Sequence, residues 1–235
     1  EIGLGCWQLG GDFGPVGDEE AKAILRKARS LDVNFWDTAD VYGGGQSETR
    51  IGQFVDKRGG FVATKVGRND TLWPNHYSRR NVKESIAGSI KRLGVETLDL
   101  VQLHCVPRPV LDDGEIFNVM DDLRDEGLMR HYGASVESVE EGLLCLRHDG
   151  IATLQTIFNL FRQDATTELL PKAQQQNVGI IVRLPLASGA ADGQVHQGYA
   201  LHRAGPPHLQ SRGQGVLRGR DVLGAAVREG RGAGG

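Results

Sequence analysis

Four polar side chains stand at or just beyond the ends of apolar segments, where they could share one reaction: Asp37, Tyr42, Lys65 and His104. A tyrosine phenol has an ordinary pKa of about 10, and a buried lysine ammonium beside it favours the phenolate and lowers that pKa. An aspartate paired with the lysine keeps the ammonium charged, and a histidine can polarise a carbonyl oxygen by a hydrogen bond. Such a set would protonate the alkoxide that forms when a carbonyl accepts hydride.

Hydride has to come from a bound cofactor, because no side chain supplies it. Each of the four residues also has an ordinary structural role: a strand-end aspartate caps a turn, a lysine in an apolar segment extends to the surface, and a lone histidine packs in the core. Four such types at successive strand ends favour the catalytic interpretation. Cys105 adjoins His104, but neighbours on a strand point to opposite faces, so a thiol nucleophile is the weaker interpretation.

Seven short β-rich segments alternate with helical patterns, which predicts a parallel α/β fold. The predicted strands are Ile2–Trp7, Asn34–Ala39, Phe61–Val66, Leu98–His104, Met129–Val136, Thr153–Asn159 and Gly179–Pro185. The predicted helices are Glu19–Leu31 after Asp18 as cap, a helix that follows Ser47 as cap and ends at Val55, Arg79–Leu93 after Ser78 as cap, Ile116–Leu123, Val139–Leu146 and Thr167–Gln175. The strands are continuous apolar segments, which is typical of buried parallel strands.

The glycines decide between two parallel folds. A doubly wound nucleotide-binding sheet carries Gly-x-Gly-x-x-Gly directly after its first strand, and the glycines of residues 3–11 lack that spacing. We therefore predict a (β/α)8 barrel, whose active site lies on the rim formed by the carboxyl ends of the strands. Ser135 and Gln155 reach the same rim from the fifth and sixth strands. Seven βα units are recognisable and an eighth strand is not, so the predicted barrel is incomplete.

Five segments carry a resemblance to a known family. They are NFWDTADVYGGGQSE (34–48), VATKVGR (62–68), RLGVETLDLVQLHC (92–105), GASVE (133–137) and IVRLPLASG (181–189). In this order they resemble the aldo-keto reductases, over about residues 2–189. By that resemblance Tyr42 is the general acid, Asp37 and Lys65 adjust its pKa, and His104 orients the carbonyl. The implied activity is reduction of an aldehyde, ketone or sugar with NADPH, or with NADH in some members.

The resemblance also implies cofactor contacts on the barrel rim. Ser135 and Gln155 would bind the nicotinamide amide, with Asp37 beside them. The remaining implied cofactor contacts are Cys6 and Trp7 along the nicotinamide pocket, Arg183 in strand seven, and Leu186, Ser188 and Gly189 near the pyrophosphate. Trp73 and His76 are candidate substrate contacts together with His104, and a loop anchored by one tryptophan is the plain alternative for the first two.

Two positions depart from the family pattern. Val136 stands where many members have an asparagine that binds the amide, so one amide contact is in doubt. Arg183 stands where many members have an aromatic residue that stacks on the nicotinamide ring. A guanidinium plane can also stack, or it can bind a phosphate or a substrate carboxylate.

Residues 190–235 differ from the rest of the chain in composition. They hold eleven of the 33 glycines and six arginines, but no Lys, Ile, Phe or Trp. Their net charge is +3, whereas the net charge of the whole chain is −3. Only Asp221–Glu229 has a short helical pattern. A flexible, disordered Gly/Arg-rich arm is one interpretation of this tail.

A frameshift is the sharper interpretation of the same tail. Relatives continue after PLASG with a sequence like Leu-Leu-Thr-Gly-Lys-Phe. Back-translating Ala190–Gln197 and dropping the first base permits Leu, Leu, Thr, Gly, Lys, Phe, Thr and Lys in that order. We therefore predict a domain of residues 1–189 and an out-of-frame tail of residues 190–235. A chain lacking its eighth strand and 2′-phosphate site would expose strand edges, bind NADPH weakly and have weak or no activity.

Composition argues against several other classes of protein, such as nucleic-acid-binding and membrane proteins. The chain is 235 residues long, with 39 % hydrophobic and 24 % charged residues, and its mild acidity argues against nucleic-acid binding. It has no long apolar segment and no leader pattern, which predicts a cytoplasmic protein. The expected partner is a small carbonyl compound. Because the sequence begins at Glu1, we expect its natural start to be missing. Its three cysteines indicate neither disulfides nor a metal site. No pattern indicates an oligomeric state.

Two alternatives to a reductase stay open. The family includes cofactor-sensing subunits, so the chain could be a non-catalytic NADPH-binding module, although an intact general acid argues against this. A decayed gene product without function is the other alternative, and the tail favours it over the binding module.

Overall fold

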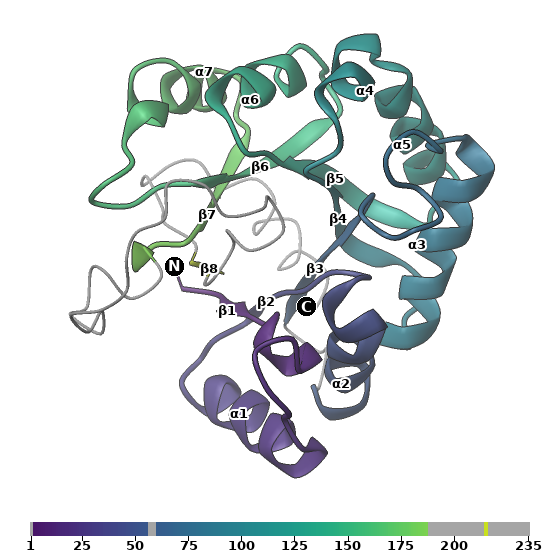
Figure 1. The fold of residues 1–235 in the computed structure, drawn as a ribbon, viewed down its shortest axis with the longest axis vertical. Helices are drawn as coiled ribbons and strands as arrows, with labels where there is room; N and C mark the ends of the chain where they lie inside the picture. The colour runs from purple at the N-terminus through teal and green to yellow at the C-terminus, as the bar shows by residue number, and fades with distance from the viewer. Residues whose placement is uncertain (1, 56–59, 188–213, 216–235) are drawn as a thin grey trace, which may run out of the picture.

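The computed structural model describes residues 2–55, 60–187 and 214–215. Within them, seven parallel strands follow one another in chain order and curl around a common centre, with the helices outside (Figure 1). The strands are β1 (Leu4–Gly5), β2 (Phe35–Asp37), β3 (Phe61–Val66), β4 (Leu98–His104), β5 (Met129–Ser135), β6 (Ile151–Ile157) and β7 (Gly179–Arg183). The predicted parallel barrel, incomplete as expected, is confirmed.

The helices occur between the strands, as in repeated βα units. The α-helices are α1 (Asp18–Ser30), α2 (Gln46–Phe54), α3 (Arg79–Leu93), α4 (Arg108–Asp113), α5 (Glu115–Asp125), α6 (Val139–Cys145) and α7 (Leu169–Gln175). Three short 3-10 turns are η1 (Gln8–Gly10), η2 (Tyr42–Gly45) and η3 (Asp164–Thr166). The helix α4 was not expected from the sequence, because its six residues are too short for a periodic apolar pattern.

The helix starts show how tertiary contacts alter local expectations. Helix α3 has its predicted bounds, and the Ser78 side chain accepts a hydrogen bond from the Asn81 amide as the cap requires. Asp18 was expected as the cap of α1, but Gly17 occupies that position and Asp18 lies 2.9 Å from Arg50 instead. Ser47 lies inside α2, and its hydroxyl donates to the Cys6 carbonyl at 2.6 Å. Both polar groups therefore connect different elements rather than cap their own helices.

The strands alternate between two faces, and this decides what fills the barrel. Trp36, Val62 and Val101 pack outward in the main hydrophobic core beneath the helices. A second apolar cluster consists of Ala63, Leu100 and Ile181, with Phe35 and Phe61 packed against it. Each member of this second cluster except Phe61 lies two residues before a polar residue on its strand, so the polar side chains form the next layer on the inner face.

The eighth position is occupied in an unexpected way. The two-residue strand β8 (Gln214–Gly215) pairs antiparallel with Val182 and Arg183 of β7 and also lies close to β1. No eighth strand was expected from the tail, because it shows no alternating pattern, yet two residues suffice for main-chain pairing without one. A parallel eighth strand does not occur among the described residues. The expected helix at 221–229 lies outside the described residues.

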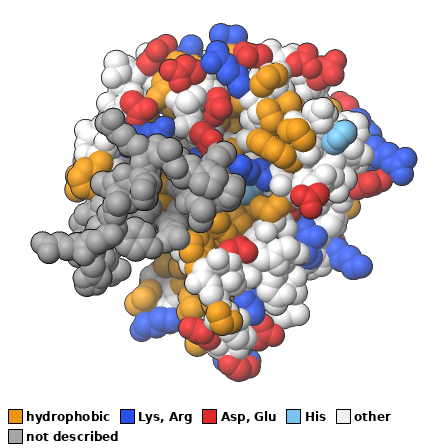
Figure 2. Space-filling view, viewed as in Figure 1, with side chains coloured by type: hydrophobic (Ala, Val, Ile, Leu, Met, Phe, Trp, Pro, Cys, Tyr) orange, Lys and Arg blue, Asp and Glu red, His pale blue; other side chains and the backbone are white. Residues whose placement is uncertain are grey.

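The surface of the described part is mixed in character. Figure 2 shows acidic and basic side chains interspersed over one face, with hydrophobic side chains between them. Ile2, Leu160 and Phe161 are the most exposed large hydrophobic side chains in this part of the chain. Over the same residues, no helix has the length and apolar character needed to cross a membrane.

Candidate active site

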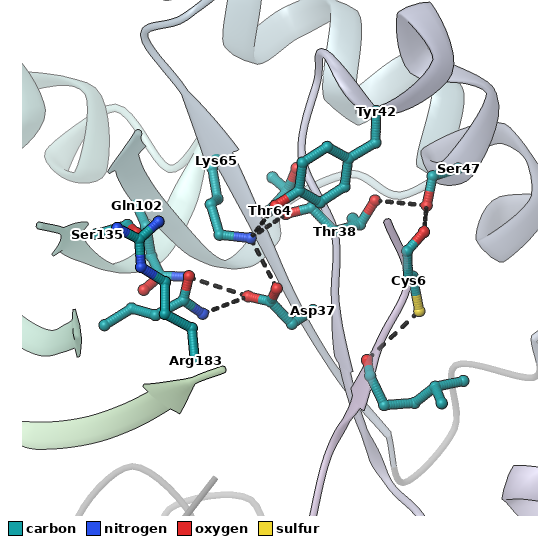
Figure 3. Close-up of polar contacts among 12 residues, drawn as sticks. Cys6, Asp37, Thr38, Tyr42, Ser47, Thr64, Lys65, Gln102, Ser135 and Arg183 are labelled. Carbon is teal, nitrogen blue, oxygen red and sulfur yellow. Dashed lines mark hydrogen bonds and ion pairs between the residues drawn. The ribbon is translucent and has the colours of Figure 1, made fainter. Parts of the chain in front are cut away.

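Three of the four candidate catalytic side chains form one hydrogen-bonded group inside the barrel (Figure 3). The Lys65 ammonium donates to Asp37 Oδ2 at 2.7 Å and to Tyr42 Oη at 3.2 Å. Its third bond goes to the Thr38 carbonyl at 2.8 Å, so all three ammonium protons have partners. Lys65 is fully buried, with Asp37 2 % and Tyr42 5 % exposed. The lysine charge is therefore held beside the phenol without contact with bulk water.

The Tyr42 loop is held by close backbone packing against the loop after β1. Gly43 and Gly44 both adopt left-handed conformations, with φ values of 58° and 61°. The Gly43 amide donates to Asp12 Oδ2 at 3.0 Å, and the Trp7 indole donates to the same oxygen at 2.8 Å. Trp7 then stacks on Tyr42 with ring centroids 5.4 Å apart. These contacts fix the phenol at the rim.

We expect Gly43→Ala to destabilise the fold by about 3 kcal/mol. A Cβ atom at Gly43 would lie 2.0 Å from the Gly10 carbonyl oxygen, in addition to the left-handed backbone cost of about 1–2 kcal/mol. Gly44→Ala is the matched control, because its φ is similar but no described atom lies within 4 Å of the added Cβ; about 1 kcal/mol is expected. Urea unfolding of both variants measures the difference, and equal losses would show that the contact with Gly10 does not matter.

Asp37 is shared between the lysine and two amides that come from other strands. Its Oδ1 atom accepts hydrogen bonds from Gln155 Nε2 at 2.9 Å and from Gln102 Nε2 at 3.3 Å. The Gln155 Oε1 atom is buried and has no hydrogen-bond partner among the described residues. Gln102 was missed in the sequence, although strand alternation places it on the same face as His104, two residues later, and this signal could have found it.

Burial changes the expected acidity of the phenol. We expected Lys65 to leave Tyr42 with a lowered pKa, but burial raises the pKa of Tyr42 above its ordinary value and outweighs the lowering effect of Lys65. Burial lowers the pKa of Lys65, yet the Asp37 carboxylate and Tyr42 outweigh this effect, so its pKa lies above the ordinary value. At neutral pH the phenol is therefore protonated next to a charged ammonium.

His104 lies at the end of β4 beside the phenol. Its ring is 5.8 Å from the Tyr42 ring in an edge-on arrangement, and it is 7 % exposed. Its Nδ1 atom is buried without a partner among the described residues. Burial, followed by the charges of Lys65, Arg68 and Arg183, lowers the pKa of His104 well below its ordinary value. The imidazole is therefore neutral near pH 7, when it can still donate one hydrogen bond.

Cys105 lies on the site side of its strand, which differs from the expectation. Its thiol contacts the Ser135 hydroxyl at 3.7 Å and Arg183 Nη1 at 3.5 Å. Cys105 has a φ of 47°, which ends the alternation of β4 and turns the side chain toward β5 and β7. Arg183 also donates to the Val136 carbonyl at 3.2 Å, and the guanidinium lies across the strand ends near Ser135 (Figure 3).

The other candidate residues lie at different distances from this group. Cys6 is buried; its thiol donates to the Leu4 carbonyl at 3.4 Å, and burial raises its pKa. Trp73 is 38 % exposed and lies 5.1 Å from the Arg68 guanidinium, whereas no side-chain contact places His76 in the site. Leu186 is 54 % exposed. Ser188 and Gly189 lie outside the described residues, and over those residues no cluster of His, Cys, Asp and Glu could hold a metal ion.

A buried carboxyl next to the lysine strand predicts a pH-dependent stability. Asp40 accepts hydrogen bonds from Asn69 at 2.7 Å and Ser85 at 3.0 Å, but its other oxygen is buried without a partner among the described residues, and burial raises its pKa to about 6. A raised carboxyl pKa penalises the ionised form, so the penalty is absent below about pH 4 and complete above about pH 6. We expect Asp40→Asn to raise the free energy of unfolding by about 2 kcal/mol at pH 8, and to change it little at pH 4. Denaturant unfolding at the two pH values measures this; an equal effect at both would contradict it.

Comparisons with known proteins identify the family. The sequence profile described as the Aldo/keto reductase family matches residues 1–229. The chain belongs to the aldo/keto reductase family. The aldo-keto reductase YhdN of Bacillus subtilis is 30 % identical over 208 residues, which cover 85 % of this chain and 62 % of that protein.

Two further relatives show the range of this family. An aldo-keto reductase from Klebsiella pneumoniae, solved in complex with NADPH, has a TM-score of 0.68 at 26 % identity, over 80 % of this chain and 64 % of that one. A probable voltage-gated potassium channel subunit beta of Oryza sativa is 30 % identical over 211 residues, covering 84 % of this chain and 63 % of that protein. The aldo/keto reductase chain described here thus spans less than two thirds of the length of these relatives.

Proposed function

We propose that this aldo/keto reductase reduces a small aldehyde or ketone to an alcohol with NADPH, and that Tyr42 donates the proton. The observation that carries the proposal is the Lys65 ammonium, which is buried and binds both the Tyr42 phenol and the Asp37 carboxylate. A buried cation beside a protonated phenol stabilises the phenolate that proton transfer produces. This arrangement favours a general acid over a structural tyrosine.

The other side chains have separate parts in the proposed reaction. His104, neutral and at the phenol's edge, donates a hydrogen bond to the carbonyl oxygen and holds it near Tyr42 Oη. Asp37 holds the ammonium in place, and the amides of Gln155 and Gln102 hold Asp37. As negative charge develops on the carbonyl oxygen, Tyr42 transfers its proton to that oxygen. Lys65 then stabilises the phenolate until it regains a proton from solvent.

The residues present fit the nicotinamide end of the cofactor. The buried Gln155 Oε1 atom has no partner among the described residues, so one acceptor is available to a carboxamide. Ser135 lies next to Gln155 across paired strands. We assign the amide to Ser135 and Gln155, with Cys6 and Trp7 along the pocket. The bound cofactor would supply the hydride.

The sequence of residues 190–235 affects how tightly this chain is expected to bind NADPH. We propose that residues 190–235 are read out of frame after one extra base near codon 190, so that the residues holding the adenosine 2′-phosphate in relatives are missing. NADPH would then bind weakly. Sequencing of the coding DNA across Leu186–Gln194 tests this: if the extra base is absent, the natural protein has a different segment after residue 189, and if it is present, the chain lacks those phosphate-binding residues.

One experiment separates the reductase from its two alternatives. NADPH oxidation with a panel of aldehydes, at saturating NADPH, is compared between the unchanged chain and Tyr42→Phe. Turnover that depends on Tyr42 supports the reductase. Equal slow oxidation by both chains favours a non-catalytic NADPH-binding subunit; the relative from Oryza sativa is named as a probable voltage-gated potassium channel subunit beta. A chain without turnover and without a cooperative melting transition favours a decayed gene product.

A further inference from the structure

Three charged side chains outside the proposed proton-transfer group meet at the strand ends. Arg68 follows β3, Glu137 follows β5, and Arg183 ends β7. The Glu137 Oε1 atom lies 3.8 Å from Arg68 Nη1 and 4.0 Å from Arg183 Nη2. Arg183 Nη1 lies 3.5 Å from the thiol of Cys105, the residue that follows His104.

Among the described residues, the two guanidinium groups and the one carboxylate leave one positive charge without a counter-ion closer than 3.8 Å. The Glu137 contacts are longer than the roughly 2.7–3.2 Å of a charge-assisted hydrogen bond, and its side chain is 47 % exposed. The Arg183 side chain is only 6 % exposed, and its buried Nε atom has no partner among the described residues. Lys65, in contrast, is balanced by Asp37 at 2.7 Å. A buried guanidinium is costly unless an anion with good geometry accompanies it.

We propose that Arg68 and Arg183 bind a carboxylate carried by the carbonyl substrate, so that the substrate class is an acidic aldehyde or ketone. Glu137 would occupy this place between the two guanidinium groups until the substrate carboxylate replaces it. The carbonyl half of this inference rests on the proposed function, whereas the carboxylate half rests on the charge arrangement.

The position of Arg68 favours a substrate anion over a cofactor phosphate. Its guanidinium lies 5.1 Å from the ring of Trp73, in the loop that follows β3, whereas the resemblance assigns the pyrophosphate to the segment after β7. A planar guanidinium beside an aromatic ring suits a flat carboxylate with an attached apolar group. The Glu137 carboxylate near both arginines shows that a group of this size fits.

The test compares two probes, one with a carboxylate and one with that carboxylate neutralised as a methyl ester. Binding of 4-formylbenzoate and of its neutral methyl ester to the full chain is measured by calorimetry, without cofactor. We expect the carboxylate to bind about tenfold tighter than the ester, and Arg68→Gln to remove this preference. Glu137→Gln should tighten 4-formylbenzoate binding about threefold, because a competing carboxylate is removed. Arg80→Gln is the matched control: Arg80 is exposed on α3 and, within the described part of the chain, forms an ion pair with Glu84, so the preference should persist.

Each outcome decides the proposal separately from the reductase. Equal binding of the two probes, no binding of 4-formylbenzoate, or an unchanged preference in Arg68→Gln would overturn it. A competition arm with inorganic pyrophosphate covers the phosphate source: if Arg68→Gln weakens pyrophosphate and leaves 4-formylbenzoate unaffected, the arginines serve the cofactor and the substrate assignment is wrong. Because no step requires turnover, an inactive chain can still support the carboxylate site, and an active one can still refute it.

Discussion

Tyr42→Phe is expected to lower the rate of carbonyl reduction by about 10³-fold or more, with NADPH affinity changed less than about twofold. The substitution removes the only proton that the phenol can give, while the ring keeps its stacking on Trp7 and its edge contact with His104. Rates are measured by NADPH oxidation at saturating NADPH, and affinity by quenching of protein fluorescence. A loss of affinity equal to the loss of rate would point to a binding role instead.

Tyr132→Phe is the matched control for this measurement. The Tyr132 hydroxyl donates to Asp121 at 3.0 Å, on the helix-covered side of the barrel, and is equally a buried tyrosine. Its removal costs one hydrogen bond, worth about 1 kcal/mol of stability, and should leave the rate per folded molecule unchanged. A similar loss of rate in both variants would contradict a specific role for the Tyr42 proton.

Lys65→Met is expected to lower the free energy of unfolding by about 3–5 kcal/mol and to abolish reduction. The change leaves the Asp37 carboxylate buried with only the two amides of Gln155 and Gln102. Burial already raises the pKa of Asp37, and Lys65 opposes this, so its removal raises that pKa further. A raised carboxyl pKa makes the ionised form unfavourable in the folded state, so the variant should regain stability as the pH falls toward that pKa.

The double variant Asp37→Asn with Lys65→Met distinguishes two causes of the stability loss: an unpaired buried carboxylate and the lost packing of the lysine side chain. If the loss in Lys65→Met comes from an unpaired buried carboxylate, neutralising Asp37 should restore about half of it or more at pH 7. Urea unfolding of the two single variants and the double variant gives this coupling energy. Equal stability of the double variant and Lys65→Met would mean that the lysine acts through packing alone.

The sequence by itself determined the class of the fold and the face on which the site lies. Strand alternation is a local property, so residues 61–66 and 98–104 could be read as strands with the correct inward side chains, Lys65 and His104 among them. The apolar period and the Ser78 cap similarly determined α3 to its ends. The family motifs rest on the same local patterns, and the family membership that they predicted is confirmed.

Tertiary structure alone decided how these residues interact. Gln102 and Asp37 are 65 positions apart in the chain. They form a hydrogen bond because β2 and β4 lie on either side of β3. The pKa of Tyr42 depends on how completely the surrounding elements exclude water, which a motif does not encode. Burial therefore raises this pKa, whereas the sequence led us to expect that Lys65 would lower it. Cys105 turned toward the site through one positive φ. The meeting of Arg68, Glu137 and Arg183 likewise depends on the curl of the sheet, because a flat sheet would keep the ends of β3, β5 and β7 two strands apart from one another.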